Sequence, residues 1–235
     1  MAPSYSLAHN DLGSLLFENG RIPDREPFSP WWDGTQPFTQ FYTLTQLAMY
    51  AAYAAGALAF DDALRIACAY SRMLRRFRGQ GAMALVELGW EAAGAVAAVQ
   101  QGSVFRAVED SRETTVLGGP PLAMAAAVEA LGASGIACRW VWVDVAPHCP
   151  LLQPARTELL QELRSLRPRR AKIPFISGVT GSELSGERLD AEHWARNFTE
   201  PVSFSRAIDT LIGQGHRVFV DVGPHPITRT APPIV

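Results

Sequence analysis

Cysteine is scarce in this sequence. The 235 residues contain three, Cys68, Cys138 and Cys149, and their positions follow neither paired nor metal-ligand spacing. A disulfide framework needs an even set of cysteines, and a structural zinc site needs closely paired cysteine or histidine ligands. We therefore expect neither a disulfide nor a metal site, and no other cofactor. The cysteine usage fits a reducing cytoplasm.

An excess of charge of one sign is also absent. The formal net charge is −2 at pH 7, so the chain offers no basic field for the backbone of a nucleic acid. The arginine cluster Arg72, Arg75, Arg76 and Arg78 is spaced like the solvated face of a helix. We therefore expect no nucleic-acid partner.

Long hydrophobic runs are absent too. The alanine-rich stretch over residues 47–59 is too short to span a bilayer and is typical of a buried helix. The chain does not open on the basic, apolar and small-residue regions of a signal peptide. We expect no membrane partner and a cytoplasmic location.

What the sequence does contain is enough apolar material for a core, since 48% of its residues are hydrophobic. The clearest pattern lies in residues 82–143. Alternation and helical spacing there predict a strand over 83–88, a helix over 90–99, strands over 104–108 and 114–117, a helix over 121–131 and a strand over 138–143. This β-α-β-β-α-β order predicts a ferredoxin-like unit, with a four-stranded antiparallel sheet and two helices on one face.

Larger elements flank this unit. The predicted elements are two helices joined by a tight turn over 39–77, a helix from 150 to about 166, a strand over 173–176, a helix opened by Asp190, a helix over 204–212 and a buried strand over 218–222. The chain is therefore predicted to be an α/β protein with the small unit inserted into it. A cleft is expected between the two.

His148 is the candidate for chemistry. It follows the last predicted strand of the small unit and precedes the helix that Pro150 starts. A histidine at the end of a strand, rather than on a packed face, is where an enzyme can hold a general base. The alternative interpretation is a polar loop histidine without a task, because a single histidine does not identify a site.

Several segments, taken in order, resemble the acyltransferase domain of modular type I polyketide synthases, a relative of the malonyl transferase of fatty acid synthesis. They are residues 54–63, 81–87, 143–148, 173–181, 194–204 and 218–226. The resemblance implies the α/β fold class, with an α/β-hydrolase-type large subdomain over 1–81 and 144–235 and a ferredoxin-like small subdomain over 82–143. Because the N-terminal part and the nucleophile elbow of the family are not found, the large subdomain is expected to be incomplete and the less stable of the two.

The resemblance also implies a reaction. In the family a serine attacks a malonyl-type thioester of coenzyme A while a histidine takes its proton, and the acyl group then passes to the phosphopantetheine thiol of an acyl carrier protein. His148 matches this histidine, and the backbone oxygen of Ser203 matches the group that orients it. The residues Val145, Ala146 and Pro147 match the substrate-selectivity segment. The implied partners are acyl-CoA, an acyl carrier protein and polyketide synthase modules.

Two departures from the family pattern fall on the chemistry. Gly-x-Ser-x-Gly, the turn that presents the serine, does not occur; a gap-free alignment puts Thr45 in the place of the serine but supplies neither glycine. A second alignment instead places a deletion of the strand and elbow at about 46–51. Tyr70 occupies the position of the arginine that binds the substrate carboxylate, and a tyrosine cannot form that bidentate charged pair.

Three functions therefore stay open: an acyltransferase-family protein of polyketide biosynthesis, a noncatalytic module that docks a carrier protein or synthase, and a truncated gene product without a function of its own. In each case we expect His148 to line the cleft, near the backbone of Ser203. Without a serine to bond, its imidazole is expected to titrate near the ordinary value of about 6.5 and to react readily with diethylpyrocarbonate.

Overall fold

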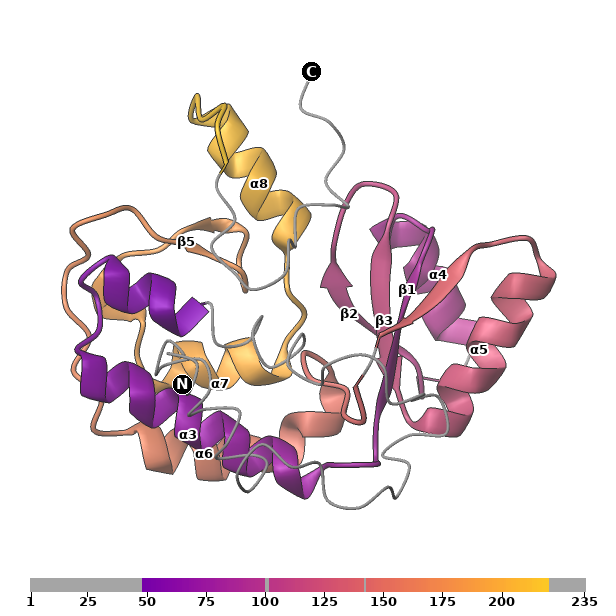
Figure 1. Ribbon diagram of the computed structural model, residues 1–235, viewed down its shortest axis with the longest axis horizontal. Helices are drawn as coiled ribbons and strands as arrows, with labels where there is room; N and C mark the ends of the chain where they lie inside the picture. Colours follow the sequence, from indigo (N-terminus) through magenta and orange to yellow (C-terminus); the bar gives the residue numbers. More distant parts are fainter. Residues whose placement is uncertain (1–47, 100–101, 142, 220–235) are drawn as a thin grey trace, which may run out of the picture.

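The computed structural model describes residues 48–99, 102–141 and 143–219, and these form two parts that lie side by side (Figure 1). One part is built on a four-stranded sheet and the other on packed helices. Helical residues 48–54 lead through a turn at Gly56, where φ is 77°, into α3 (Phe60–Arg76). Glycine adopts such a left-handed conformation without steric cost. The predicted pair of helices with a tight turn is confirmed over residues 48–77, and residues 39–47 of the prediction lie outside the described ranges.

The sheet has the predicted composition. Its strands are β1 (Ala82–Val86), β2 (Phe105–Glu109), β3 (Thr115–Gly119) and β4 (Cys138–Val141). They lie in the order β2-β3-β1-β4, and each neighbouring pair is antiparallel. The helices α4 (Trp90–Val99) and α5 (Pro121–Ala133) connect them, so the β-α-β-β-α-β prediction is confirmed. We call residues 82–141 the ferredoxin-like unit.

Both helices of the ferredoxin-like unit cover one face of its sheet. Ala82, Ala84 and Val86 of β1 pack in one apolar cluster with residues of α4 and α5, whereas Met83 between them belongs to the core of the other part. This is the alternation that a strand with two buried faces produces. The face without helices is therefore turned toward the remainder of the chain, as Figure 1 shows.

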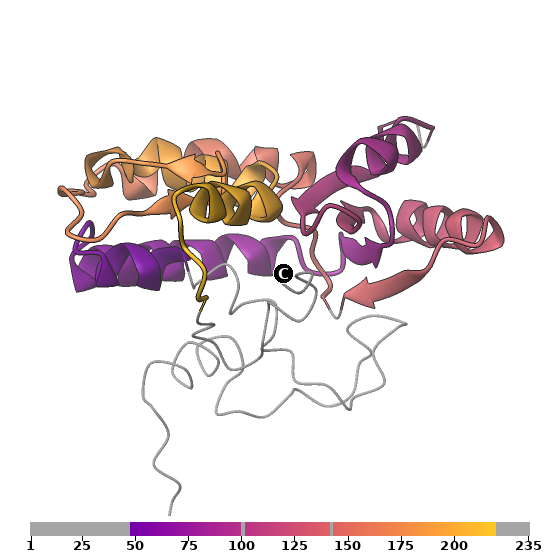
Figure 2. The same cartoon turned by 90° about the horizontal axis from the view of Figure 1, so that it is seen from above.

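The second part, residues 48–81 and 143–219, is built mainly of packed helices, and we call it the helical part. α3 packs on α6 (Arg156–Leu163), and α6 packs on α7 (Ala191–Thr199); Figure 2 shows α3 running beneath them. Its largest fully buried side chains include Ile66, Leu74, Leu159, Leu163, Trp194 and Phe198. Within the described ranges, none of the helices combines the length and the apolar character needed to cross a membrane.

Arg72, Arg75 and Arg76 are exposed on α3, as their spacing predicts, and two of them also join α3 to α6. For Arg78 the prediction is wrong, because this residue lies beyond the end of α3, is only partly exposed and pairs with the buried Asp144. Arg72 forms an ion pair with Glu162, and Arg76 forms one with Glu158. Since these groups are largely exposed, each pair contributes little free energy of unfolding. They orient the two helices rather than hold them together.

Two of the flanking elements differ from the prediction because of proline. The segment after Pro150 begins as a 3-10 helix, η2 (Pro150–Ala155), and becomes α-helical only at α6, because Pro154 has no N–H for a helical hydrogen bond. The strand predicted over 173–176 is wrong for most of its length, since Pro174 interrupts it. Only the two-residue strand β5 (Ile176–Ser177) forms, paired with β6 (Ser182–Glu183) before the short helix η3 (Gly186–Arg188).

The end of the described chain carries one confirmed element and one correction. The helix α8 (Phe204–Gly213) forms where the pattern predicts it. The buried strand predicted over 218–222 is wrong for its first residues, because Val218 is 83% exposed and residues 218–219 lie in no strand. An apolar sequence run is buried only where another element covers it. Residues 220–222 lie outside the described ranges.

Candidate functional site

His148 lies on the segment that returns from the ferredoxin-like unit to the helical part. The seven residues from Val143 to Cys149 are all buried. The backbone of His148 is left-handed, with φ 61°, and it is the one non-glycine residue in the described chain with a positive φ. Such a conformation is uncommon outside glycine and persists only where surrounding contacts hold it. The left-handed backbone therefore indicates that surrounding contacts fix the direction of this side chain.

Two main-chain carbonyls of α7 hold His148. Its Nδ1 lies 2.8 Å from the carbonyl oxygen of Asn197, and its backbone N–H donates to the carbonyl of Phe198 at 3.2 Å. A carbonyl can only accept a hydrogen bond, so Nδ1 carries the proton. In the neutral ring the lone pair then lies on Nε2. The contact thus selects the tautomer that can act as a base through Nε2.

Asn197 is the functional residue that the sequence analysis missed. The backbone oxygen of Ser203 was expected to orient His148, and this prediction is wrong: that oxygen accepts from the N–H of Ala207 at the start of α8. The physical reason is the end of α7 at Thr199. The last carbonyls of a helix have no partner within it, and those of Asn197 and Phe198 are therefore available to His148. Pro201, two residues beyond α7, is the sequence signal for this end.

The electrostatic state of His148 also differs from the expectation. Its side chain is 6% exposed, and burial lowers the pKa of its imidazole from 6.5 to about 4, against the opposing effect of the backbone of Asn197 and Glu200. Titration near the ordinary value in an open cleft is therefore wrong. Desolvation disfavours the charged ring, so the imidazole is neutral at pH 7.

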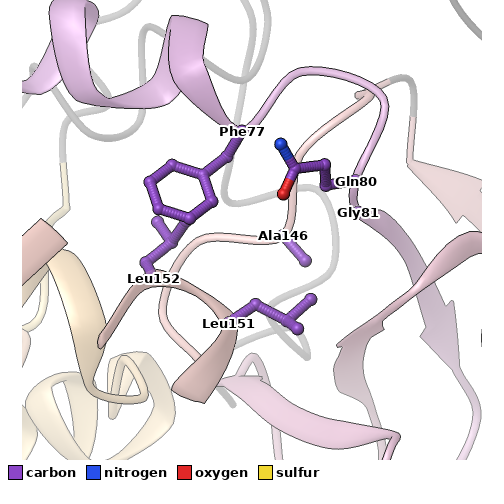
Figure 3. A pocket seen from close by; sticks show the side chains of 6 residues that line it. All are labelled: Phe77, Gln80, Gly81, Ala146, Leu151 and Leu152. Carbon is purple, nitrogen blue, oxygen red and sulfur yellow. The ribbon is translucent and has the colours of Figure 1, made fainter. Parts of the chain in front are cut away.

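The residues before His148 meet the start of the small unit very closely. Val145, Ala146 and Pro147 are buried, and a Cβ added to Gly81 would lie 2.3 Å from the backbone nitrogen of Ala146. Only glycine allows this approach. Beside this crossing lies a small pocket of about 60 Å³, lined by Phe77, Gln80, Gly81, Ala146, Leu151 and Leu152 (Figure 3). His148 does not line this pocket, and its expected place on a cleft between the two parts stays a prediction.

An ion pair joins the two segments that meet at Gly81 and Ala146. The Arg78 Nε donates to the Asp144 carboxylate at 3.2 Å, and the Gly79 N–H donates to the main-chain carbonyl of Asp144 at 2.8 Å. Burial raises the pKa of Asp144, while the bond to Arg78 acts in the opposite direction. The two segments that enter and leave the ferredoxin-like unit are therefore linked directly, a short distance along the chain from His148.

Of the other residues that the sequence analysis names around the site, Tyr70 and Cys149 are both buried. Tyr70 is 2% exposed in the core between α3 and α7, where its hydroxyl contacts the main-chain oxygen of Trp194 and the side chain of Asn197. Its role in substrate binding stays a prediction. Thr45 lies outside the described residues. Cys149, next to His148, is directed elsewhere, since its thiol donates to the carbonyl of Ala146 at 3.0 Å.

Comparison with known sequences identifies relatives of this arrangement. A family model described as the acyl transferase domain matches residues 48–232. The polyketide synthase GfsB of Streptomyces halstedii is 40% identical over 178 residues, which cover 75% of this chain and 3% of that protein. The erythronolide synthase EryA2 of Saccharopolyspora erythraea is 36% identical over 181 residues, which cover 77% of this chain and 5% of that protein. The chain thus spans a small share of these relatives.

Solved structures agree. The acyltransferase domain from module 8 of the salinomycin polyketide synthase is similar with a TM-score of 0.75 and 33% identity, covering 77% of this chain and 43% of that one. A loading acyltransferase from the avermectin modular polyketide synthase is similar with a TM-score of 0.75 and 31% identity, covering 78% and 59%. Sequence and fold together show that this chain belongs to the acyltransferase domain family of modular polyketide synthases.

Proposed function

We propose that this chain moves an acyl group from a coenzyme A thioester to the phosphopantetheine thiol of an acyl carrier protein, with His148 as the general base. The observation that carries the proposal is the contact between the His148 Nδ1 and the Asn197 carbonyl. The contact fixes the orientation of the ring, as a catalytic histidine requires. It also keeps the proton on Nδ1, so that Nε2 can accept a proton from the nucleophile.

The electrostatics of His148 support the same role. A general base must be unprotonated when the nucleophile arrives. Burial lowers the pKa of His148 to about 4, which keeps the imidazole neutral at pH 7 and also makes it a weaker base than a histidine that titrates near pH 7. A hydroxyl that attacks the thioester carbonyl would give its proton to Nε2. The ring would then return this proton to the departing thiolate of coenzyme A, so that the base is regenerated. Thr45 is the candidate for that hydroxyl.

Tyr70 limits the acyl groups that fit this proposal. Its side chain is neutral, and burial holds the pKa of its phenol well above the ordinary value. Without a guanidinium at this position, a free carboxylate on the acyl unit has no bidentate charged partner there. We therefore propose that the acyl group is one without a second carboxylate.

Intact-protein mass spectrometry tests both parts of this proposal. The full chain is incubated separately with malonyl-, methylmalonyl- and propionyl-CoA. We expect no adduct with the first two thioesters and a covalent propionyl adduct that is lost in Thr45→Ala and strongly reduced in His148→Gln. Thr43→Ala, two residues away, is the matched control and should retain the adduct.

Two outcomes would contradict the proposal. If the folded chain takes up no acyl group from any thioester, it is not an acyltransferase of this kind, and the noncatalytic module becomes the better description. If malonyl transfers stoichiometrically, the selectivity assigned to Tyr70 is wrong although the activity stands.

A further inference from the structure

Tyr70 is buried and, like His148, contacts Asn197. It projects from α3 into the contact with α7, and its hydroxyl lies 2.5 Å from the Trp194 carbonyl and 3.2 Å from the Asn197 side-chain oxygen. Its ring lies 4.7 Å from that of Phe198. One side chain of α3 thus contacts three residues of α7.

The same stretch of α7 holds His148 on its other side. The main chain of Asn197 accepts from the His148 ring, and the main chain of Phe198 accepts from the His148 backbone. Asn197 and Phe198 therefore each touch Tyr70 with the side chain and His148 with the carbonyl. A displacement of these two residues would move both hydrogen bonds of His148 at once.

We infer that Tyr70 is a positioning residue for His148, which acts by holding the Asn197 carbonyl in place and so keeps the proton of the imidazole on Nδ1. This is a different task from carboxylate binding. It depends on the phenol oxygen, because a ring alone would still pack on Phe198 but could not bond to α7. The inference rests on the proposed function, since the tautomer of His148 matters for chemistry only if His148 is the base.

The test uses the full chain with ¹⁵N-labelled histidine, because nitrogen chemical shifts report which ring nitrogen carries the proton. In the unaltered chain we expect His148 to be predominantly the Nδ1–H tautomer. Tyr70→Phe keeps the ring and removes the hydroxyl. We expect it to lower the ratio of Nδ1–H to Nε2–H tautomer about fivefold, the equivalent of one lost hydrogen bond. Tyr53→Phe, which alters an exposed tyrosine, is the matched control and should leave the ratio unchanged.

Asn197→Ala supplies a second, independent variant, because it keeps the carbonyl that His148 uses and removes only the group beside Tyr70. We expect the tautomer ratio to fall in this variant as well, and the double variant to show less than the sum of both effects, as residues in one network do. If Tyr70→Phe does not fold, Asn197→Ala alone decides the question.

The inference is overturned if a folded Tyr70→Phe or Asn197→Ala variant shows the same His148 tautomer and titration as the unaltered chain. Tyr70 would then only stabilise the contact between α3 and α7. This readout does not use turnover, so the two proposals can fail separately. A changed tautomer in a chain that transfers no acyl group would retain the positioning role and remove the proposed function.

Discussion

The ferredoxin-like unit and the helical part close their cores in different ways. In the ferredoxin-like unit, one cluster joins β1 to α4 and α5, which all lie within the continuous segment 82–141. In the helical part, residues such as Tyr70 and Trp194 meet although they are 124 positions apart. α8 has no buried residue at all. The core of the ferredoxin-like unit is formed by residues of one continuous segment, whereas the core of the helical part is formed by residues far apart in the sequence.

Stability and chemistry lie in different parts of the molecule. Contacts between near neighbours are formed with little loss of chain entropy, whereas distant contacts depend on many elements being in place together. The groups around His148 all belong to the second kind, because α3, α7 and the segment 143–149 meet there. The site is therefore in the part of the molecule that is easier to disturb.

The largest expected effect tests whether the two cores are separate. Leu117 and Leu163 are each fully buried, one in each core. Replacing either by alanine should cost about 2–5 kcal/mol of unfolding free energy. In hydrogen exchange, Leu163→Ala should deprotect α3, α6 and α7 while β1 and β3 stay protected. If Leu163→Ala deprotects the whole sheet equally, the two parts form one cooperative unit and the comparison fails.

Acid should act on the helical part before it acts on the ferredoxin-like unit. His148 and His193 both lie in the helical part, and burial lowers the pKa of each from 6.5 to about 4. The unfolded chain therefore binds more protons than the folded one in this window, so stability is full above pH 6.5 and is lost as the pH falls toward 4. The loss amounts to about 3 kcal/mol for each histidine.

Denaturation as a function of pH measures this loss. His148→Gln and His193→Gln should each flatten the dependence between pH 6.5 and 4, while His216→Gln, which alters an exposed histidine, should leave it unchanged. An unchanged slope in both buried variants would show that neither ring is neutral because of burial.

The junction between the two parts provides a smaller test. An alanine Cβ at Gly81 would meet the Ala146 nitrogen at 2.3 Å, so Gly81→Ala should force the two crossing segments apart and cost about 1–3 kcal/mol. Gly132 in α5 has open space around it, and Gly132→Ala should stabilise its helix by up to about 1 kcal/mol. Chemical denaturation of both variants gives the comparison. Equal effects would mean that the close approach at Gly81 is not a constraint.

The smallest expected effect concerns the turn at His148. Because φ there is 61°, His148→Gly should be more stable than His148→Ala by about 1 kcal/mol. Cys149 has an extended backbone with φ −148°, so Cys149→Gly should instead be less stable than Cys149→Ala. Thermal melting of the four variants measures both differences. The same order at both positions would refute the left-handed turn.

Much of this molecule could be predicted from the sequence where structure follows local period. The order of strands and helices in the ferredoxin-like unit was predicted within a few residues of each boundary, because alternation and helical spacing are properties of short segments. The helix opened by Asp190 was also predicted, and the Asp190 side chain does accept from the His193 N–H. Errors occurred at Pro154 and Pro174, where a missing N–H outweighed an apolar pattern.

From the sequence alone follow the strands and helices of the ferredoxin-like unit, and that His148 comes after its last strand. The surroundings of this histidine depend instead on how distant segments pack. They are the Asn197 carbonyl in place of that of Ser203, the burial that keeps the ring neutral, and the contact of Tyr70 with the Asn197 side chain. A main-chain carbonyl can accept a hydrogen bond from a distant ring only if it lies in the last turn of its helix and if that turn packs against the ring. That packing depends on how α3, α6 and α7 come together, which cannot be predicted from the spacing of residues within one short segment.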